Sequence, residues 1–425
     1  MKIVIIHGWS DDNKGDSAII MGMLNYFKTH FSAFSVSIVS VYDDYRNTCY
    51  DLNSFAKKHN IIIDKLTSPI GLKIDRSKNK LLRYFLHTTN ILRKFLILLS
   101  PALFKFLLNK REKITLSVIS NADFVISKGG HIFFSISPKA FLFIFTHGFY
   151  VFLAKRLKRK IALFSQSFGP FHGKITKFMF GKILEYSNLV MCREDSSLSL
   201  LKQFTAKSKK IKSKIIYFPD FAFNIKPIYD ELFDKITSHN KNFFEGAIGI
   251  TIRQHQFVKN NTEEYLSTIE KLIRKLIKNE EKIIIFPHVI GPTKSEDDRI
   301  IAERLYEKFW EEKQVLLLNK TPNAEVLCAL YSKLKLLIGT RFHSVILSLN
   351  TGIPTFAISY SGPKADIMKK FNMGDYLISI EDVNSENLEL IWLRVKALIE
   401  NRTEIRKKIK NSLIEEKKHF ENNLL

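Results

Sequence analysis

Three side chains that can bind or protonate an anion lie close together in the last third of the chain. Arg341 and His343 follow an apolar run of strand length at 334–338, and Lys364 follows a second such run at 354–359. A short helical stretch separates the two runs, so the pattern predicts a β-α-β unit. Ligands of open parallel sheets bind beyond the carboxyl ends of the strands, where these three groups can converge on one anion. The alternative is structural, with Arg341 paired to a surface carboxylate and His343 capping the helix.

A second candidate lies near the start of the chain. A strand predicted at 2–6 is followed by a turn with Asn13, Gly15 and Asp16, and then by a helix predicted at 17–28. Free backbone N–H groups and the helix dipole make such a turn a general cradle for an anion or a substrate. It lacks the glycine spacing of a dinucleotide fingerprint and the Gly-Lys-Ser/Thr of a Walker loop. Two roles are open for Asp16, acceptor binding and N-terminal capping of the helix.

Composition and charge narrow the class of protein. A chain of 425 residues predicts two domains, and 45% hydrophobic with 25% charged residues is typical of globular proteins. The net charge of +24 fits a nucleic-acid binder, a protein on an anionic membrane surface, or an enzyme for polyanionic substrates. Zinc-finger spacing, an RNA-binding sheet signature and an Arg-rich tail are all missing from the sequence, so we expect no nucleic-acid partner.

Neither disulfides nor a metal site are expected. The three cysteines, Cys49, Cys192 and Cys328, are far apart and form no Cys-x-x-Cys pair, which favours a reducing compartment. Asp297 and Asp298 begin a predicted helix, where neighbouring carboxylates are usually dipole partners and not a metal pair. No cluster of metal-ligand residues is apparent in the sequence.

The chain opens directly on a strand, with no long apolar stretch or cleavage site behind it, so we expect a cytoplasmic protein. Residues 91–108 come nearest to a membrane span, but their charges and Pro101 favour a helical hairpin or an interfacial helix. The wider segment 66–116 is rich in both Lys/Arg and Leu/Phe. Such a basic amphipathic segment either packs its apolar side on the domain or lies on anionic lipid at the inner face of the cell membrane.

Strands alternate with helices in both halves, which predicts an α/β protein with two doubly wound domains. We expect an N-terminal domain at 1–235 that contains the basic segment as an insertion, and a C-terminal domain at 245–390. A polar stretch at 226–243 has the composition of a linker. The last residues, 391–425, have helical periodicity and are expected to pack back across the domains.

Several short motifs occur in one order along the chain and together resemble the polysaccharide pyruvyl transferase family. The longest is Gly-x-Arg-Phe-His, then Gly-x-Pro, a strand, Ser-Tyr and Lys, matched here from Gly339 to Lys364. The others are Asn-x-Gly-Asp at 13–16, a glycine-rich turn at 128–130, Gln-x-x-Gly-Pro at 166–170, Arg193 at a strand end, and Asp-x-x-Phe at 220–223. Family members usually have a third glycine where Lys128 stands. The match covers most of residues 1–374, apart from the basic segment.

The resemblance implies two Rossmann-like domains facing a central cleft, similar to the B-type fold of glycosyltransferases. It also implies a reaction in which pyruvate moves from phosphoenolpyruvate onto two hydroxyls of a sugar as a cyclic ketal, without a cofactor. His343 would be the general acid, and Asp16 would orient or deprotonate the acceptor. Four cations would bind the donor's phosphate and carboxylate, and each Arg side chain could bind one of these groups bidentately. The four are Arg193, Arg341, Lys364 and Arg253.

Loops of the acceptor site or cleft would include Asn13, Gly15, Gly129, Gly130 and Gln166. Arg193 has a structural alternative, a pair with an adjacent carboxylate at 194 or 195, which is less favoured because adjacent helical residues do not face each other. The acceptor stays open among galactose, mannose and N-acetylated sugars of a capsule, exopolysaccharide or wall polymer, or of its lipid-linked oligosaccharide precursor.

Two other functions fit the same sequence. A sugar-nucleotide-dependent glycosyltransferase of the B-type fold would also bind a diphosphate, and nucleotide binding would reveal it. A non-enzymatic, membrane-associated polysaccharide assembly protein would explain the basic charge. It would leave His343 and Lys364 without a common task.

Overall fold

The computed structural model describes most of the chain. The described residues are 1–8, 10–41, 50–59, 61, 63–66, 80–137, 141–206, 208, 211, 214–238, 241–253, 262–291, 294–318, 322–360 and 362–425. Cys49 and part of the basic segment, 67–79, lie outside them. Cys192 and Cys328 are buried free thiols.

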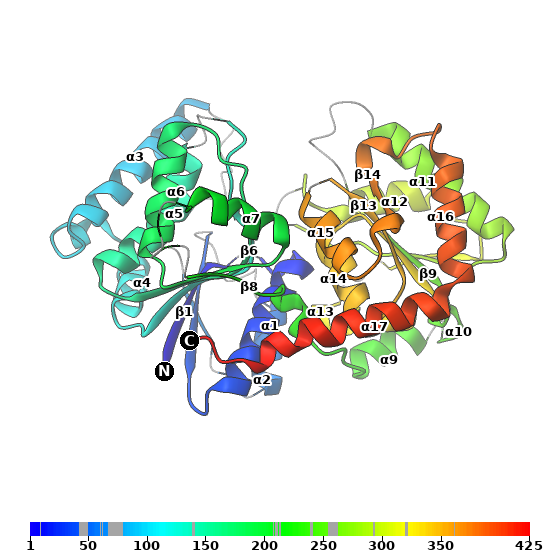
Figure 1. Cartoon of the computed structure of the whole chain (residues 1–425), viewed down its shortest axis with the longest axis horizontal. Coiled ribbons are helices and arrows are strands. Elements are labelled where there is room, and N and C mark those ends of the chain that lie inside the picture. Colours follow the sequence, from blue (N-terminus) through cyan, green and yellow to red (C-terminus); the bar gives the residue numbers. More distant parts are fainter. Residues whose placement is uncertain are drawn as a thin grey trace. The chain divides into compact units, whose positions relative to one another are not determined.

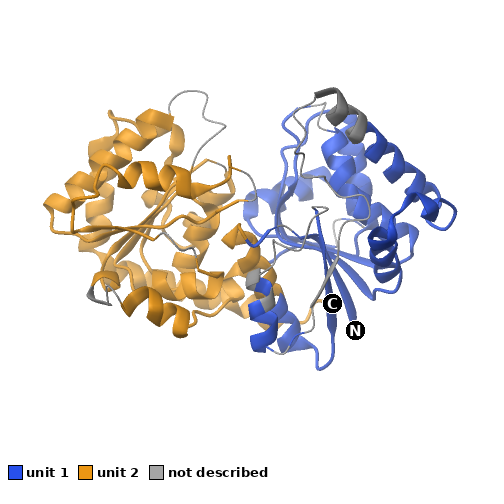
Figure 2. Ribbon diagram, turned by 180° about the vertical axis from the view of Figure 1, so that it is seen from behind, with its two compact units in different colours: residues 1–11, 24–220 blue, residues 12–23, 221–425 orange. Residues whose placement is uncertain are grey.

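The chain divides into two compact units (Figure 2). Unit 1 comprises Met1–Asp11 and Leu24–Asp220, and unit 2 comprises Asp12–Met23 and Phe221–Leu425. The division at Asp220 comes earlier than the predicted boundary at 235. It also gives unit 2 a short segment from the start of the chain, which contains the predicted cradle.

Unit 1 is built on an eight-stranded sheet with the order β3-β2-β1-β4-β6-β7-β8, and β5 pairs with β6 (Figure 1). All these pairs are parallel, as helices between successive strands require. The strands are β1 (Lys2–Gly8), β2 (Ser35–Ser40), β3 (Ile63–Leu66), β4 (Phe124–Ser127), β5 (Gly130–Phe133), β6 (Lys160–Phe168), β7 (Leu189–Cys192) and β8 (Ile215–Tyr217).

The helices of unit 1 cover this sheet and bury one apolar core between α5, α6 and the strands. Helix α5 is almost wholly apolar along most of its length and contributes much of this core. The helices are α1 (Lys14–His30), which begins in unit 2, then α2 (Tyr50–His59), α3 (Lys80–Leu99), η1 (Leu103–Leu107), α4 (Lys110–Ser120), α5 (Phe141–Arg156), α6 (Lys174–Tyr186) and α7 (Asp195–Phe204).

Unit 2 has a six-stranded parallel sheet with the order β11-β10-β9-β12-β13-β14. Because helices cover both faces, the central strands are buried along their whole length, and so they are continuous apolar runs. The strands are β9 (Ile248–Thr251), β10 (Ile283–Ile285), β11 (Val315–Leu317), β12 (Leu336–Gly339), β13 (Thr355–Ser359) and β14 (Leu377–Ser379).

The stretch predicted as a linker is not a loop, since α9 and α10 form within it. Phe233 and Thr237 of α9 are buried, so this helix packs one face on the unit although most of its residues are polar. The last helices, α16 and α17, are in unit 2. The helices of this unit are η3 (Phe221–Asn224), α9 (Glu231–Ser238), α10 (Lys241–Phe244), α11 (Thr262–Lys278), α12 (Asp298–Tyr306), α13 (Ala324–Ser332), α14 (Phe342–Asn350), α15 (Gly362–Lys370), η4 (Gly374–Tyr376), η5 (Ile380–Asp382), α16 (Leu388–Glu400), α17 (Arg402–Lys418) and η6 (His419–Glu421).

The predicted fold class, two doubly wound parallel α/β sheets, is confirmed. In each sheet the chain starts in the middle, adds two strands on one side and then adds the rest on the other. Each sheet therefore has a point where the strand order reverses, between β1 and β4 in unit 1 and between β9 and β12 in unit 2. Within the described residues, no helix is both long and apolar enough to cross a membrane.

Candidate active site

The point of strand reversal in unit 2 brings several predicted residues together. Thr251 of β9 lies in register with Gly339 of β12, so the turns that follow these strands are neighbours. The Thr251 hydroxyl is within hydrogen-bond distance of Ser344 Oγ (2.8 Å), and Tyr265 Oη lies 2.9 Å from Thr340 Oγ1. These buried hydroxyl pairs fix the turn that carries Arg341.

Arg341 is held by a carboxylate that the sequence did not indicate. Its Nε donates to both oxygens of Asp298 (2.9 and 3.1 Å), its Nη2 donates to Asp298 Oδ1, and Nη2 also donates to the Glu296 carbonyl (3.2 Å). Burial lowers the pKa of Arg341, but the charge of Asp298 and the hydrogen bonds to it outweigh burial and raise that pKa. The Arg341 fork is thus oriented from one side by a buried carboxylate and not by a surface one.

Asp298 lies in the first turn of α12 and is fully buried. Burial raises the pKa of Asp298, while Arg341 and the backbone N–H groups of His288 and Val289 oppose this shift. Those two N–H groups donate to Asp298 Oδ2 over 3.3 and 3.0 Å. The carboxylate therefore links the turn after β10 to the turn after β12.

Lys364 and Arg253 meet at Tyr360. The Arg253 guanidinium lies 4.4 Å and the Lys364 ammonium 4.8 Å from the centre of the Tyr360 ring. Lys364 is fully buried and donates to the carbonyls of Thr340 and Ile358, the latter over 2.5 Å. Burial, and then the charges of Arg253 and Arg341, hold the pKa of Lys364 well below its usual value. Three cations thus share one region at the strand ends.

His343 lies in the first turn of α14, and Arg341 rather than His343 is the N-cap residue of that helix. A neighbouring imidazole, His288, follows β10 and is also buried. Burial, followed by the charges of His343, Arg341 and Lys14, holds the pKa of His288 well below its usual value. His288 is therefore neutral in the folded chain, and the region it faces is positively charged.

The predicted cradle at 13–16 contacts this region because it belongs to unit 2. Asn13 pairs with Val289 in an antiparallel bridge, and the Lys14 N–H donates to the His288 carbonyl (3.4 Å). A Cβ on Gly15 would lie only 2.3 Å from Nδ1 of His343, so glycine here allows the helix start and the imidazole to touch.

Helix α1 begins at Lys14, three residues before the predicted start, and Asn13 immediately precedes it. Its Oδ1 accepts from the N–H groups of Gly15 (3.1 Å) and Asp16 (3.4 Å), so Asn13 caps the helix and Asp16 does not. Asn13 Nδ2 donates to Asp16 Oδ2 over 2.6 Å, which orients that carboxylate within the first turn.

The other predicted residues lie in unit 1, at or near the carboxyl ends of β4, β6 and β7. Gly130 is in register with Gln166, and Gln166 Nε2 donates to Ser127 Oγ (2.6 Å) and to the carbonyl of Lys128 (3.0 Å), the residue before Gly129. His7 Nδ1 in turn lies 2.8 Å from Ser127 Oγ. The Gln166 amide nitrogen therefore ties strand ends together.

Arg193 forms the pair that helix geometry made less favoured, so that expectation is wrong. Its Nε lies 3.3 Å from Glu194 Oε2, and its Nη1 donates to Asp220 Oδ2 over 2.7 Å. Glu194 is the N-cap of α7 with extended backbone, so the rule for adjacent residues inside a helix does not apply to it. Arg193 is in unit 1, whereas the other three predicted donor cations are in unit 2.

Two residues of the cluster were not predicted as site residues, Asp298 and His288. His288 follows β10, and Asp298 accepts hydrogen bonds from the turn after that strand. The turn Pro287-His288 has the same position relative to β10 as the Arg341 turn has relative to β12, and this similarity could have pointed to His288 in the sequence. Among the described residues, no group of three His, Cys, Asp or Glu side chains is placed to hold a metal ion.

Comparison with solved structures agrees with this architecture. A UDP-N-acetylglucosamine 2-epimerase described as putative, from Listeria monocytogenes, matches with a TM-score of 0.59 and 10% identity over 97% of this chain and 91% of its own. HepE (Alr3699) of Anabaena, solved in complex with UDP-glucose, matches with a TM-score of 0.54 and 10% identity over 99% and 95%. At such identity the likeness shows the fold alone, which is similar to that of B-type glycosyltransferases and UDP-sugar epimerases.

Sequence comparison adds the family. The amylovoran biosynthesis protein AmsJ of Erwinia amylovora is 23% identical over 432 aligned residues, which cover 98% of this chain and 96% of AmsJ. The family model for polysaccharide pyruvyl transferase matches residues 13–362, from the cradle to the end of the Arg341 region. That span contains every residue of the candidate site described above except His7 and Lys364. The chain is a member of the polysaccharide pyruvyl transferase family and has a transferase role in polysaccharide biosynthesis.

Proposed function

We propose that the chain moves pyruvate from phosphoenolpyruvate onto two hydroxyls of one sugar in a cell-surface polysaccharide or its lipid-linked precursor. The product is a cyclic pyruvate ketal, and phosphate is released. Phosphoenolpyruvate carries its own leaving group, so the proposal needs no cofactor. Because this donor is a cytoplasmic metabolite, the reaction is proposed to take place in the cytoplasm.

One observation carries the proposal. Arg253, Arg341 and Lys364 gather with the His343 imidazole at the strand reversal of unit 2, against a single buried carboxylate, Asp298. A net positive site of this kind suits a donor that has a phosphate and a carboxylate on the same carbon. The field also favours an anion over a neutral ligand.

The three cations differ in how free they are to donate hydrogen bonds to the donor. Arg341 donates from Nε and Nη2 to Asp298, and Lys364 donates to two carbonyls, so both would act on the donor mainly through their charge and position. Arg253 Nε is buried and has no hydrogen-bond partner within the described residues. Arg253 is therefore the best placed of the three for a direct bond to the donor.

The chemistry can be assigned to named groups. His343 would protonate the methylene carbon of phosphoenolpyruvate, and the adjacent carbon would become cationic. One sugar hydroxyl attacks that carbon, the bond to the phosphate oxygen breaks, and a second hydroxyl closes the ketal. Of the two hydroxyl protons, one returns to His343 and restores the acid, and the other leaves on the departing phosphate, directly or by way of Asp16. Arg193 remains a prediction as a donor ligand.

Thermal unfolding with separate ligands tests the donor. Phosphoenolpyruvate at 100 times its Kd should stabilise the folded chain by about 2.7 kcal/mol, whereas uridine and guanosine diphosphates should not. Arg253→Ala should abolish this shift, and Arg274→Ala, which removes a surface pair with Glu270, should keep it. A shift with a nucleotide and none with phosphoenolpyruvate would make a glycosyltransferase the better interpretation.

His343→Ala tests the acid. This variant should still be stabilised by phosphoenolpyruvate but should lose roughly 100-fold or more in rate, the usual effect of removing a general acid. The ketal methyl signal in the proton NMR spectrum of polysaccharide from cells making only this variant should disappear. A normal signal would remove the assignment.

A further inference from the structure

A strip of exposed apolar side chains lies on α3 and η1 of unit 1. The strip consists of five residues with exposures of 50–70%: Leu92, Phe95, Leu99, Leu103 and Phe106. Its members on α3 are spaced three and four apart, which places them on one face of the helix. Figure 1 shows α3 on the outside of unit 1. Soluble proteins rarely expose so many large apolar groups side by side unless that surface binds something.

The charges around the strip have one sign. Residues 88–120 contain six Lys and Arg and a single acid, Glu112. That acid is buried and bonded to Arg93 Nη2 at 2.9 Å, so its charge is compensated. Lys105, Lys110 and Arg111 are exposed. The strip is thus an apolar surface bordered by cations and by no exposed carboxylate of its own segment.

A cationic pocket adjoins the strip. It has a volume of about 920 Å³ and is lined by six Lys and Arg side chains with one acid, Glu185. Glu185 pairs with Lys182 at 2.8 Å. The cations of this pocket are Lys155, Arg156, Lys158, Arg159, Lys160 and Lys214.

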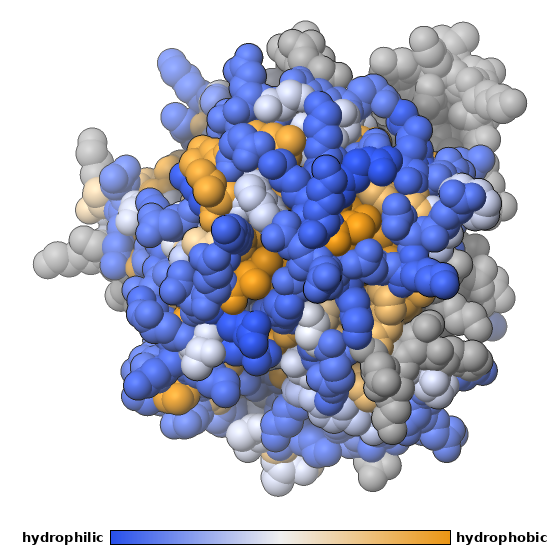
Figure 3. Space-filling model, turned by 90° about the vertical axis from the view of Figure 1, so that its right-hand side faces the viewer, coloured by the Kyte–Doolittle hydropathy of each residue, from blue (hydrophilic) through white to orange (hydrophobic). Residues whose placement is uncertain are grey.

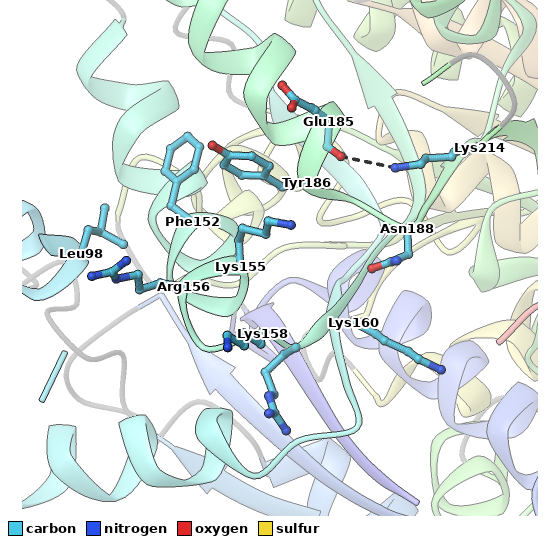
Figure 4. Close-up of a pocket in the computed structure, with 11 residues that line it drawn as sticks. Leu98, Phe152, Lys155, Arg156, Lys158, Lys160, Glu185, Tyr186, Asn188 and Lys214 are labelled. Atoms are coloured by element: carbon cyan, nitrogen blue, oxygen red, sulfur yellow. Dashed lines mark hydrogen bonds between the residues drawn. The ribbon is translucent and has the colours of Figure 1, made fainter. Parts of the chain in front are cut away.

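The pocket and the strip are continuous. Arg156 Nη2 donates to the carbonyl of Leu99 over 2.8 Å, and Leu98 lines the pocket. Figure 4 shows Leu98 and Arg156 together on one side of the pocket, with Lys214 and Asn188 on the other. Lys160 begins β6, about 20 Å along the strand from Gln166. This surface therefore lies at the amino ends of the strands, whereas the loops of the candidate site lie at their carboxyl ends.

We propose that the strip and the pocket form a docking surface for an anionic lipid bilayer. The apolar side chains would enter the boundary between headgroups and acyl chains, and the pocket cations would bind lipid phosphates. This inference goes beyond the pyruvyl transfer proposed above and does not depend on it.

Charge decides between occupants of this surface. A second copy of the chain would bring another net charge of +24, so the cationic rim disfavours self-association. A nucleic acid or another soluble polyanion would use the cations but would leave the apolar strip in water. Of these occupants, the anionic membrane is the one that matches both halves of the surface. In unit 2, by contrast, the face seen in Figure 3 is mostly hydrophilic, with hydrophobic residues dispersed among polar ones.

Vesicle sedimentation tests the proposal with the whole chain. The chain should bind vesicles of equimolar phosphatidylcholine and phosphatidylglycerol, and bind vesicles of phosphatidylcholine alone far more weakly. Combining Phe95→Ser, Leu103→Ser and Phe106→Ser should lower the partition coefficient at least tenfold. Lys158→Glu with Lys160→Glu should also lower it, by roughly 30-fold or more, because each of the two basic residues near such a surface is worth about 1 kcal/mol.

Matched controls lie in unit 2. Trp310→Ser with Leu393→Ser removes exposed apolar groups, and Lys278→Glu with Lys308→Glu reverses exposed charges. Both should bind as the natural chain does. Equal losses in the controls, or equal binding to both vesicle types, would overturn the proposal. Weaker binding of soluble heparin by the apolar triple variant would do so as well, because it would indicate a polyanion groove.

The result is separate from the transferase assignment. The docking variants should keep the full thermal shift with phosphoenolpyruvate if that donor binds. A chain that binds vesicles but not phosphoenolpyruvate would support membrane docking and contradict phosphoenolpyruvate as the donor. A chain that binds phosphoenolpyruvate but not vesicles would support the donor and contradict membrane docking.

Discussion

At the scale of single residues, the interaction of Arg341 with Asp298 decides what the candidate site can be. The sequence left Arg341 with two roles, a ligand for the donor or one half of a surface ion pair. In the structure it forms an ion pair, but with a carboxylate that is fully buried in the same cluster as His343 and His288. A buried pair of this kind fixes the direction of the guanidinium, so the ion pair can serve the site instead of competing with it.

Asp298→Asn tests this role. The amide keeps the shape of the side chain but leaves the Arg341 charge buried without its partner, which should lower the free energy of unfolding by about 3–5 kcal/mol. Urea unfolding measures this change. Stabilisation by phosphoenolpyruvate should weaken as well, because Arg341 loses its orientation.

Asp297→Asn is the matched control. Asp297 caps α12 and pairs with Arg299, whose side chain is 44% exposed. Asn is an equally good cap and exposed pairs contribute little, so this change should cost less than about 1 kcal/mol. Equal stability of the two variants would show that Asp298 does not anchor a buried charge.

At the scale of elements, long apolar runs were predicted well and short or interrupted ones were not. The strand predicted at 354–359 is β13, which begins one residue later and ends at the same residue. By contrast β5 (Gly130–Phe133) begins with a glycine and β14 (Leu377–Ser379) has three residues, one exposed, so neither has a pattern that periodicity can detect. Both form because a neighbouring strand is already in place.

The same distinction holds for the site. His343, Lys364 and Arg341 were expected together because one β-α-β unit carries them. Asp298 is 43 residues from its partner Arg341, and only the order of strands in the sheet brings them into contact. Arg253 likewise follows β9, which becomes the neighbour of β12 through that order. Nothing in the local sequence reports such pairings.

Gly15→Ala tests the contact between α1 and α14. The new methyl group would lie 2.3 Å from Nδ1 and 2.5 Å from Cγ of His343, so the imidazole must move. A displacement of about 1 Å in a catalytic group can cost roughly 100-fold in rate, and we expect a loss of that order. The rate of pyruvyl transfer measures it.

Gly181→Ala in α6 is the matched control. The nearest atom to its new methyl group is 3.8 Å away, on Phe204, so nothing needs to move. Alanine is a better helix former than glycine by about 1 kcal/mol, so this variant should be slightly stabilised and fully active. An active Gly15→Ala chain would show that the position of His343 is not set by α1.

At the scale of the whole molecule, buried neutral imidazoles are present in both units. His7 and His147 lie under the sheet ends of unit 1 with ring centres 5.6 Å apart, and His288 lies in unit 2. Burial is the main cause that lowers the pKa of all three. A strongly basic chain gains further positive charge in acid, so each of these rings must be kept neutral for the fold to persist.

This arrangement predicts a fold that weakens in mild acid. Burial lowers the pKa of His147 from 6.5 to about 4. Between those values the unfolded chain binds a proton that the folded chain does not, so stability is lost as the pH falls through this window. His147 alone should make the free energy of unfolding about 2 kcal/mol lower at pH 5 than at pH 7.

His147→Phe should remove that part of the pH dependence while keeping a ring against Phe143, whose ring centre is now 4.3 Å away. His172→Phe, at an exposed position, should leave the dependence unchanged. Urea unfolding of the three chains at both pH values gives the comparison. If the His147→Phe chain loses as much stability in acid as the natural chain, then the acid sensitivity has its source in other groups, and His147 is not held neutral by the fold.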